Sequence, residues 1–144
     1  MSASDVAEIR ELLVRYASIV DGRRFDEFGS VFTADATFGS DPAALGLPAI
    51  ADYIGGLLRG CGPTQHLLGN EEIAVSGDEA TVRCQVRAIH LGAGDASHLL
   101  YELIGEYRDH AVRTESGWRL RERVLYPRIR LGQRAVVLGL APLE

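Results

Sequence analysis

The first third of the chain carries apolar residues at spacings of three and four, with polar residues between them. This spacing is typical of a helix with one buried face. The longest set predicts a helix that Ser2 or Ser4 caps and that ends at Gly22, with the apolar residues Val6, Ile9, Leu12, Leu13, Tyr16, Ile19 and Val20. A shorter set predicts a second helix, with Phe25, Phe28, Val31 and Phe32. A third helix begins at Pro48 and buries Ile50, Tyr53, Ile54, Leu57 and Leu58.

From Thr64 onward the apolar residues alternate with polar ones, which is typical of half-buried strands. Turn signals interrupt the alternation at residues 76–78, 92–95 and 114–117. The second half is therefore predicted to be a meander of long antiparallel strands. Helices followed by strands favour an α+β fold in which three N-terminal helices pack on one face of a curved, mostly antiparallel sheet. The interior of such a cone-shaped half-barrel can hold a pocket.

One predicted strand ends its apolar side on a titratable group. In "ATVRCQVRAIH", residues 80–90, the apolar side carries Ala80, Val82, Cys84, Val86, Ala88 and finally His90. The other side is polar, so the alternation itself is clear. An imidazole at the end of an apolar face is either a hydrogen-bonded core residue or a group that lines a cavity. Asp21, at the end of the first helix, and His66, in "PTQHLLGN", are also expected to point inward.

Composition narrows the class of protein. A chain of 144 residues that is 47% hydrophobic fits one domain, residues 1–144, with a core of its own. A net charge of -5 argues against nucleic-acid binding, which needs clustered positive charge. Cys61 and Cys84 form no disulfide framework. The acidic N-terminus and the lack of a long apolar run predict no signal peptide, no membrane span and a cytoplasmic location.

Two stretches carry a family resemblance. "EIRELLVRYASIVDGRRFDEFGSVFTADATF" and "GEYRDHAVRTESGWRLRERVL" are similar to the opening and the closing hairpin of SnoaL-like proteins in the NTF2-like superfamily. The resemblance implies a cone-shaped α+β barrel with a deep pocket. The superfamily includes polyketide cyclases, ketosteroid isomerases, dehydrochlorinases, dehydratases and non-catalytic dioxygenase subunits, so the resemblance leaves the activity open.

Within the superfamily, "TQHLLGNEEIAVSGDEATVRCQVRAIH" resembles scytalone dehydratases. The resemblance implies that His66 and His90 are catalytic, that Asp21 orients a histidine, and that no cofactor or metal takes part. Two histidines and a carboxylate can also hold a metal ion, which is the alternative. The sequence departs from those enzymes at Val20 and Ser40, which stand where they carry tyrosines, so scytalone itself is not the expected substrate.

These residues suit the elimination of water from a β-hydroxy carbonyl compound. A base must take the α-proton, and an acid must protonate the departing hydroxyl; histidine can do both near pH 7. We expect a cofactor-independent dehydratase-type lyase acting on a small, largely apolar, polyketide-like or aromatic substrate. The alternatives are an isomerase or cyclase with the same acid-base pair, and a non-catalytic binding or assembly module. The candidate substrate-binding residues are Tyr16, Val20, Ser40, Tyr53, Cys84, Val86, Tyr107, Tyr126 and Arg128.

The last strand and the tail complete the expectations. Alternation places Leu120, Glu122 and Val124 on the inner side of the last strand, and Arg119, Arg121 and Arg123 on the outer side as a solvated or subunit-facing stripe. The tail, residues 131–144, is too apolar to be left in water, so we expect it to cover the pocket or contact a neighbouring subunit. The resemblance implies a homodimer or homotrimer that binds a small-molecule substrate.

Overall fold

The computed structural model describes residues 2–140. Helix α1 spans Ala3–Gly22, and the Ser2 hydroxyl accepts a hydrogen bond from the Asp5 backbone N–H at its start. Helix α2 spans Leu47–Leu57 and has proline in its first turn, as predicted. The second predicted helix is a 3-10 helix, η1, over Phe25–Ser30, and Phe32 already belongs to a strand. Phe25, Phe28 and Val31 are three residues apart, which suits the three-residue turn of a 3-10 helix better than an α-helix.

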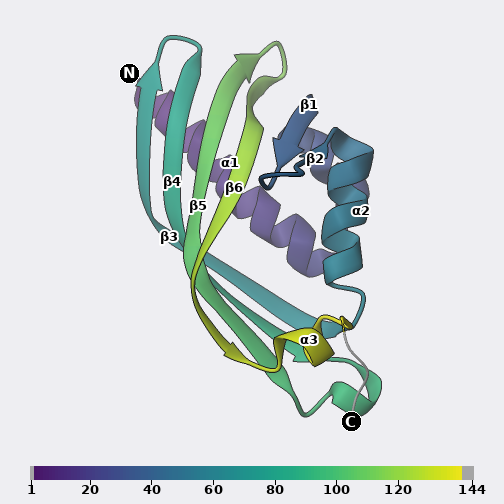
Figure 1. The fold of residues 1–144 in the computed structure, drawn as a ribbon. Helices are drawn as coiled ribbons and strands as arrows, with labels where there is room; N and C mark the ends of the chain where they lie inside the picture. The colour runs from purple at the N-terminus through teal and green to yellow at the C-terminus, as the bar shows by residue number, and fades with distance from the viewer. Residues whose placement is uncertain (1, 141–144) are drawn as a thin grey trace.

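Six strands form one mixed sheet in the order β2-β1-β6-β5-β4-β3. Their bounds are β1 Phe32–Phe38, β2 Ala44–Leu45, β3 Cys61–Ser76, β4 Glu79–Gly92, β5 Leu100–Thr114 and β6 Gly117–Gly132. β1 runs parallel to β6, and every other neighbouring pair is antiparallel. A short 3-10 turn, η2 (Gly94–Ala96), joins β4 to β5, and helix α3 (Arg134–Val137) follows β6. The chain is therefore α+β, with the helices on one side of a curved sheet (Figure 1).

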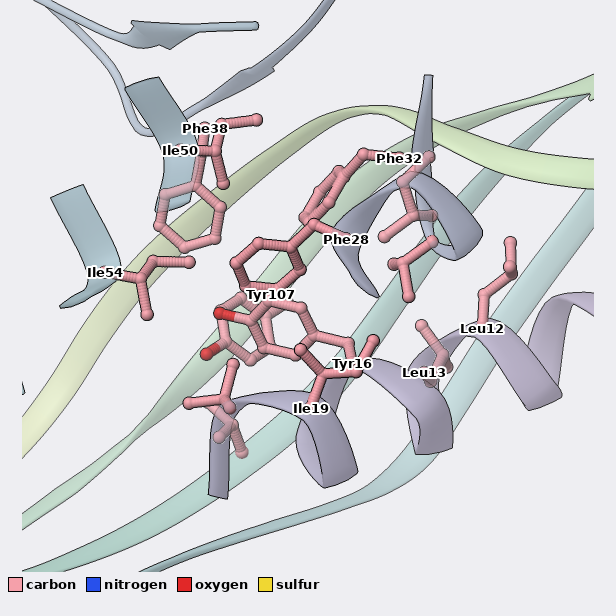
Figure 2. Close-up of a cluster of buried hydrophobic side chains, with 14 of the residues drawn as sticks. Leu12, Leu13, Tyr16, Ile19, Phe28, Phe32, Phe38, Ile50, Ile54 and Tyr107 are labelled. Carbon is pink, nitrogen blue, oxygen red and sulfur yellow. The ribbon is translucent and has the colours of Figure 1, made fainter. Parts of the chain in front are cut away.

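Helix α1 crosses the sheet and buries its apolar face against it (Figure 1). Tyr16, near the middle of that face, contacts an aromatic cluster that also includes Phe28, Phe32, Phe38 and Tyr107. Figure 2 shows that these rings come from α1, η1, β1 and β5, so the cluster joins the helical layer to the sheet. No helix within residues 2–140 has the length and apolarity needed to span a bilayer.

Strand β4 follows the predicted alternation along its whole length. Ala80, Val82, Cys84, Val86, Ala88 and His90 are all buried on the inner face. The partners of this strand in β5 are in continuous register from Glu79 to Leu91. The strand therefore delivers His90 to the inner face without any interruption.

Strand β6 departs from the alternation twice. Leu120 lies opposite Ala111, but Glu122 lies opposite His110, so one extra residue enters the strand as a bulge. The bulge turns Glu122 outward and Arg123 inward, where Arg123 is fully buried. The prediction of an inward Glu122 and an outward Arg123 is therefore wrong.

The second bulge lies near the end of β6. Pro127 faces Gly105, whereas Ile129 faces Ile104, so Arg128 is the extra residue. Gly105 makes room for it, because a Cβ there would lie 2.5 Å from the backbone oxygen of Tyr126. Beyond the bulge, Arg130 pairs with the inward-facing Leu103, and residues directly opposite one another share a face.

Candidate active site

A cavity of about 290 Å³ lies between the helices and the inner face of the sheet. Its walls come from α1, α2, the end of β1, β3 to β6, and α3. Most of the wall is apolar, formed by Val20, Phe38, Ile54, Leu57, Leu58, Leu103, Leu125 and Leu138. The polar side chains that line it are Tyr16, Ser40, Tyr53, His66, His90, Tyr101, Tyr107, Arg130 and Arg134. A small apolar molecule with a few polar groups fits such a site.

Asp21 and His66 meet at one wall of the cavity. An Asp21 carboxylate oxygen, Oδ1, lies 2.7 Å from His66 Nδ1 and accepts the Thr64 hydroxyl at 2.9 Å. The other oxygen, Oδ2, accepts the His66 backbone N–H at 2.9 Å. Burial raises the pKa of Asp21, but these hydrogen bonds outweigh it and lower the pKa overall, so the group stays a carboxylate. Asp21 therefore holds the ring with a proton on Nδ1 and leaves Nε2 for chemistry.

His90 has a different environment. Its Nδ1 lies 3.1 Å from the backbone oxygen of Tyr101, and because a carbonyl can only accept, Nδ1 carries a hydrogen. Burial lowers the pKa of His90, so the ring is neutral near pH 7 and its Nε2 is an unprotonated acceptor. The ring lies edge-on to His66, with centroids 5.6 Å apart, and stacks on the ring of Tyr101. The two histidines thus differ in the partner of Nδ1: a carboxylate for His66 and a backbone carbonyl for His90.

A buried ion pair lies behind the rings of Tyr16 and Tyr107, two of the residues that line the cavity. Arg123 donates from Nε and Nη2 to the two carboxylate oxygens of Asp109, both at 2.8 Å, and neither side chain is exposed to solvent. The guanidinium carbon lies 4.0 Å from the ring centre of Tyr107 and 4.4 Å from that of Tyr16. Burial alone would lower the pKa of Arg123, but Asp109 outweighs it and raises the pKa, so the charge is permanent.

Tyr16 and Tyr107 lie between the Arg123 guanidinium and the cavity, which both residues line. Their rings meet edge to face at 5.7 Å, and their hydroxyls lie at the same end of the aromatic cluster (Figure 2). Burial raises the pKa of both phenols, so they keep their protons and can donate hydrogen bonds. Alternation does not identify Arg123 as a buried residue, because the first β6 bulge reverses its face, and without Arg123 nothing in the sequence marks Asp109 as its partner.

The structure brings some of the sequence-predicted substrate-binding residues together and separates others. Tyr16, Val20, Ser40, Tyr53 and Tyr107 line the cavity, together with His66 and His90. Cys84 and Val86 do not line it: they are on the inner face of β4, but deeper along the strand than His90 and packed within the core. Burial raises the pKa of the Cys84 thiol to about 11, so it is not a ready nucleophile.

Tyr126 and Arg128 also lie away from the cavity. Leu125 and Pro127 face inward, so Tyr126 faces outward, where its ring stacks against the Arg108 guanidinium. Arg128 is the extra residue of the second bulge, and its side chain donates to Gln85 on the outer face. The arginine that the strand sends to the cavity is Arg130.

The tail contributes to the cavity wall. Val137 and Leu138 are buried, and Arg134 and Leu138 line the cavity. The Cys61 thiol lies 3.5 Å from the backbone oxygen of Val137, which ties the tail to the start of β3. A lid function for this segment stays a prediction, and residues 141–144 lie outside the described part of the chain. Among residues 2–140, no three His, Cys, Asp or Glu side chains are grouped to hold a metal ion.

Comparison with known proteins identifies the family. The profile of the SnoaL-like domain matches residues 1–124. The chain belongs to the SnoaL-like family. The protein Rv2910c of Mycobacterium tuberculosis is 39% identical over 126 residues, which are 84% of each chain. SnoaL-like domains have the NTF2-like fold, and the α+β arrangement seen here agrees with it.

Solved structures with the same fold include proteins whose names refer to different activities or to none. Kfla4162 of Kribbella flavida superposes with a TM-score of 0.84 and 27% identity, over 96% of this chain and 98% of the other. A Novosphingobium aromaticivorans protein named "Putative Scytalone Dehydratase" superposes with a TM-score of 0.80 and 25% identity, over 90% and 88% of the two chains. A hexachlorocyclohexane dehydrochlorinase has a TM-score of 0.79 at 16% identity, over 90% and 89% of the chains, which shows the shared fold alone.

Proposed function

We propose that this SnoaL-like protein is a dehydratase-type lyase that removes water from a small, largely apolar β-hydroxy carbonyl compound without a cofactor. The observation that carries the proposal is the Asp21–His66 pair at the wall of a mostly apolar cavity, 2.7 Å from carboxylate to ring. A partly buried carboxylate that fixes a histidine is an arrangement that enzymes use for proton transfer. The dehydratase name of the Novosphingobium relative supports the choice of reaction.

In this proposal, His66 performs both proton transfers. Its Nε2 takes the α-proton, the C–H electron pair moves into the new carbon–carbon double bond, and the β-hydroxyl leaves. The imidazolium formed is stabilised by the Asp21 carboxylate and returns its proton to the departing oxygen, so the products are water and a conjugated carbonyl compound. The free enzyme is regenerated, and no oxidant or reductant is needed.

His90 and the phenols have separate tasks. The neutral His90 presents a lone pair on Nε2, so it accepts a hydrogen bond from the substrate hydroxyl and orients it for departure. The Tyr16 hydroxyl donates to the Tyr107 oxygen, and the protonated Tyr107 hydroxyl donates to the substrate carbonyl, where negative charge develops when the α-proton is removed. Arg123, beneath both rings, adds a fixed positive charge that favours the enolate.

The test compares the wild type with His66→Ala on a panel of β-hydroxy ketones, with ultraviolet absorbance to detect the conjugated product and mass spectrometry to detect loss of water. His66→Ala should be slowed roughly 100- to 10,000-fold. The matched control is His110→Ala, because His110 is partly exposed and faces Glu79 rather than the cavity. Equal rates for the wild type and His66→Ala would end the proposal.

An isomerase or cyclase would begin with the same proton abstraction, so a second measurement separates the reactions. Mass spectrometry of the product in ordinary water shows the loss of one water for a dehydratase, whereas the product of an isomerase or cyclase keeps the mass of the substrate. A His66-dependent reaction without loss of water would replace the dehydratase assignment with one of these alternatives. Binding without any His66-dependent reaction would favour the non-catalytic module.

A further inference from the structure

Two arginines reach the cavity where the chain turns from β6 into α3. Arg130 faces inward because the second bulge of β6 reverses the alternation, and Arg134 belongs to α3. Both line the cavity, and both are exposed to solvent at its edge. None of the described residues that line the cavity is an aspartate or a glutamate. This part of the wall therefore carries positive charge with no acidic residue of the lining to balance it.

The other charged groups near the cavity are already paired. Arg123 donates from Nε and Nη2 to the two carboxylate oxygens of Asp109, and Asp21 accepts hydrogen bonds from His66 and Thr64. Within residues 2–140, by contrast, Arg130 and Arg134 have neither a hydrogen bond nor an ion pair from their side chains to a protein group. Guanidinium groups at the edge of an apolar cavity can bind an anion that enters it, and they match a carboxylate through two parallel hydrogen bonds.

The distance between these arginines and the histidines suits a small molecule. His90 lies opposite Tyr101 on β5, and Arg130 lies opposite Leu103, the next inward residue of the same strand. Two strand spacings and one inward step separate the Cα atoms of His90 and Arg130 by about 12 Å. Both side chains project into the cavity, so a compound of a few carbon atoms can contact Arg130 at one end and the histidines at the other.

We propose that Arg130, with Arg134, binds a carboxylate of the substrate, so that the substrate class is a small β-hydroxy carbonyl compound that also carries a carboxylate and is otherwise apolar. The proposal rests on the lyase function for the reaction itself, but the carboxylate site can be tested by binding alone. It also gives the second bulge a function: if Arg128 were an ordinary paired residue of the strand, alternation would turn Ile129 and Leu131 toward the cavity in place of Arg130.

The experiment measures binding of benzoate and benzamide by isothermal titration calorimetry. The two probes have nearly the same shape and differ in charge. Benzoate should bind at least about tenfold more tightly than benzamide, because a hydrogen bond to a charged group contributes more than one to a neutral group. Arg130→Gln should lower the affinity for benzoate about tenfold and leave benzamide unchanged, and Arg130→Lys should retain part of the preference because it keeps the charge but loses the planar fork.

The matched control is Arg121→Gln, because Arg121 is on the same strand, is exposed and faces away from the cavity. It should leave the affinity for both probes unchanged. Equal affinity of the wild type for the two probes, no binding of either at millimolar concentration, or an equal loss in Arg121→Gln would overturn the carboxylate site.

The same titrations on His66→Ala separate this site from the reaction. His66→Ala should bind benzoate like the wild type, because His66 is not part of the anion contact. If His66→Ala kept full turnover while Arg130→Gln lost its preference for benzoate, the lyase proposal would fail and the carboxylate site would stand. If turnover depended on His66 but benzoate and benzamide bound alike, the lyase proposal would stand and the carboxylate site would fail.

Discussion

Strands β4 and β6 lie in the same sheet, and each sends side chains to the same buried face, yet they do so by different rules. β4 alternates without interruption and places His90 where a period of two predicts it. β6 contains two bulges, and just beyond each of them an arginine takes an inward position that alternation would give to another residue. The comparison teaches that the regular strand supplies a neutral imidazole to the cavity wall, whereas the irregular strand supplies permanent positive charge.

Burial of the inward side chains also affects the free energy of folding differently in the two strands. The inward residues of β4 before His90 are small and apolar, so they gain stability from burial without needing partners. Arg123 of β6 is buried as a charge, which is costly unless a partner compensates it. Asp109 and the rings of Tyr16 and Tyr107 give that compensation. A buried ion pair beside a cavity is thus a feature of β6 that stability alone does not require.

The largest expected effect concerns catalysis at the β3–β4 end. His66→Ala removes the proton carrier, and Asp21→Asn leaves the carrier without its charge partner, so each should slow turnover roughly 100- to 10,000-fold. The two residues act as one unit through their 2.7 Å contact, so the double variant should be hardly slower than His66→Ala. Steady-state kinetics of the three variants checks this, and circular dichroism confirms that each is folded. Losses that multiply would show that the residues work independently.

The next effect tests whether the first bulge of β6 places a structurally essential charge. Arg123→Met leaves Asp109 buried without its partner, so the free energy of unfolding should fall by about 3 to 5 kcal/mol. Arg121→Met, an exposed neighbour on the same strand, should change it by less than about 0.5 kcal/mol. Urea denaturation measures both. Equal effects of the two substitutions would mean that the bulge does not direct Arg123 inward.

A double substitution sharpens this test. Arg123→Met combined with Asp109→Leu replaces the buried ion pair with apolar groups, and should regain most of the lost stability because no uncompensated charge remains. Its turnover should still be reduced, since the rings of Tyr16 and Tyr107 lose the cation beneath them. A double variant with wild-type turnover would limit Arg123 to a structural role.

The contrast between these strands explains how much of the fold was predictable. Periods of three to four and of two correctly predicted α1, α2 and the strands of the second half, because each element buries one face. The pattern at Phe25, Phe28, Val31 and Phe32 predicts a second helix but not its type, since a three-residue spacing occurs in both α- and 3-10 helices. The parallel pairing of β1 with β6 is a contact between distant parts of the chain, and local patterning has no information about it.

The candidate site was predictable only where the strand pairing is locally regular, as it is in β3 from Thr64 to Gly69 and along β4. The meeting of Asp21 with His66 and the inward direction of His90 follow from α1, β3 and β4, which have the predicted facing at these residues. Arg123 and Arg130 could not be assigned, because one extra residue in a strand moves every later side chain to the other face. One signal was present for the second bulge: an isolated glycine within a strand, Gly105, often marks a bulge or a close backbone approach.

A smaller effect is expected where the chain continues beyond β6. Leu138 is 5% exposed and lines the cavity, so Leu138→Ala should lower the free energy of unfolding by about 2 kcal/mol and weaken binding of benzoate. Leu140→Ala is the control, because Leu140 is 51% exposed, and it should change stability by less than about 0.5 kcal/mol. Thermal denaturation and calorimetry measure the two properties. If Leu138→Ala matched Leu140→Ala in both, the tail would not be part of the cavity wall.

The smallest effect returns to β4 and separates its titratable group from the permanent charges of β6. Burial lowers the pKa of His90 below the ordinary 6.5, so the unfolded chain binds a proton more readily than the folded one. Stability from the neutral His90 is therefore fully present above pH 6.5 and declines as the pH falls from 6.5 toward the folded-state pKa.

Asp21 affects stability at lower pH, so it does not contribute to the measurement between pH 7 and pH 5: its lowered pKa gives stability that is present above pH 3.8 and is lost as the pH falls through the folded-state pKa. Urea denaturation between pH 7 and pH 5 should show a decline that is shallower in His90→Asn, and NMR titration should give His90 a pKa below 6.5. A pKa above 6.5, together with a steeper decline in His90→Asn, would mean that His90 is protonated in the cavity and donates, rather than accepts, the hydrogen bond to the substrate.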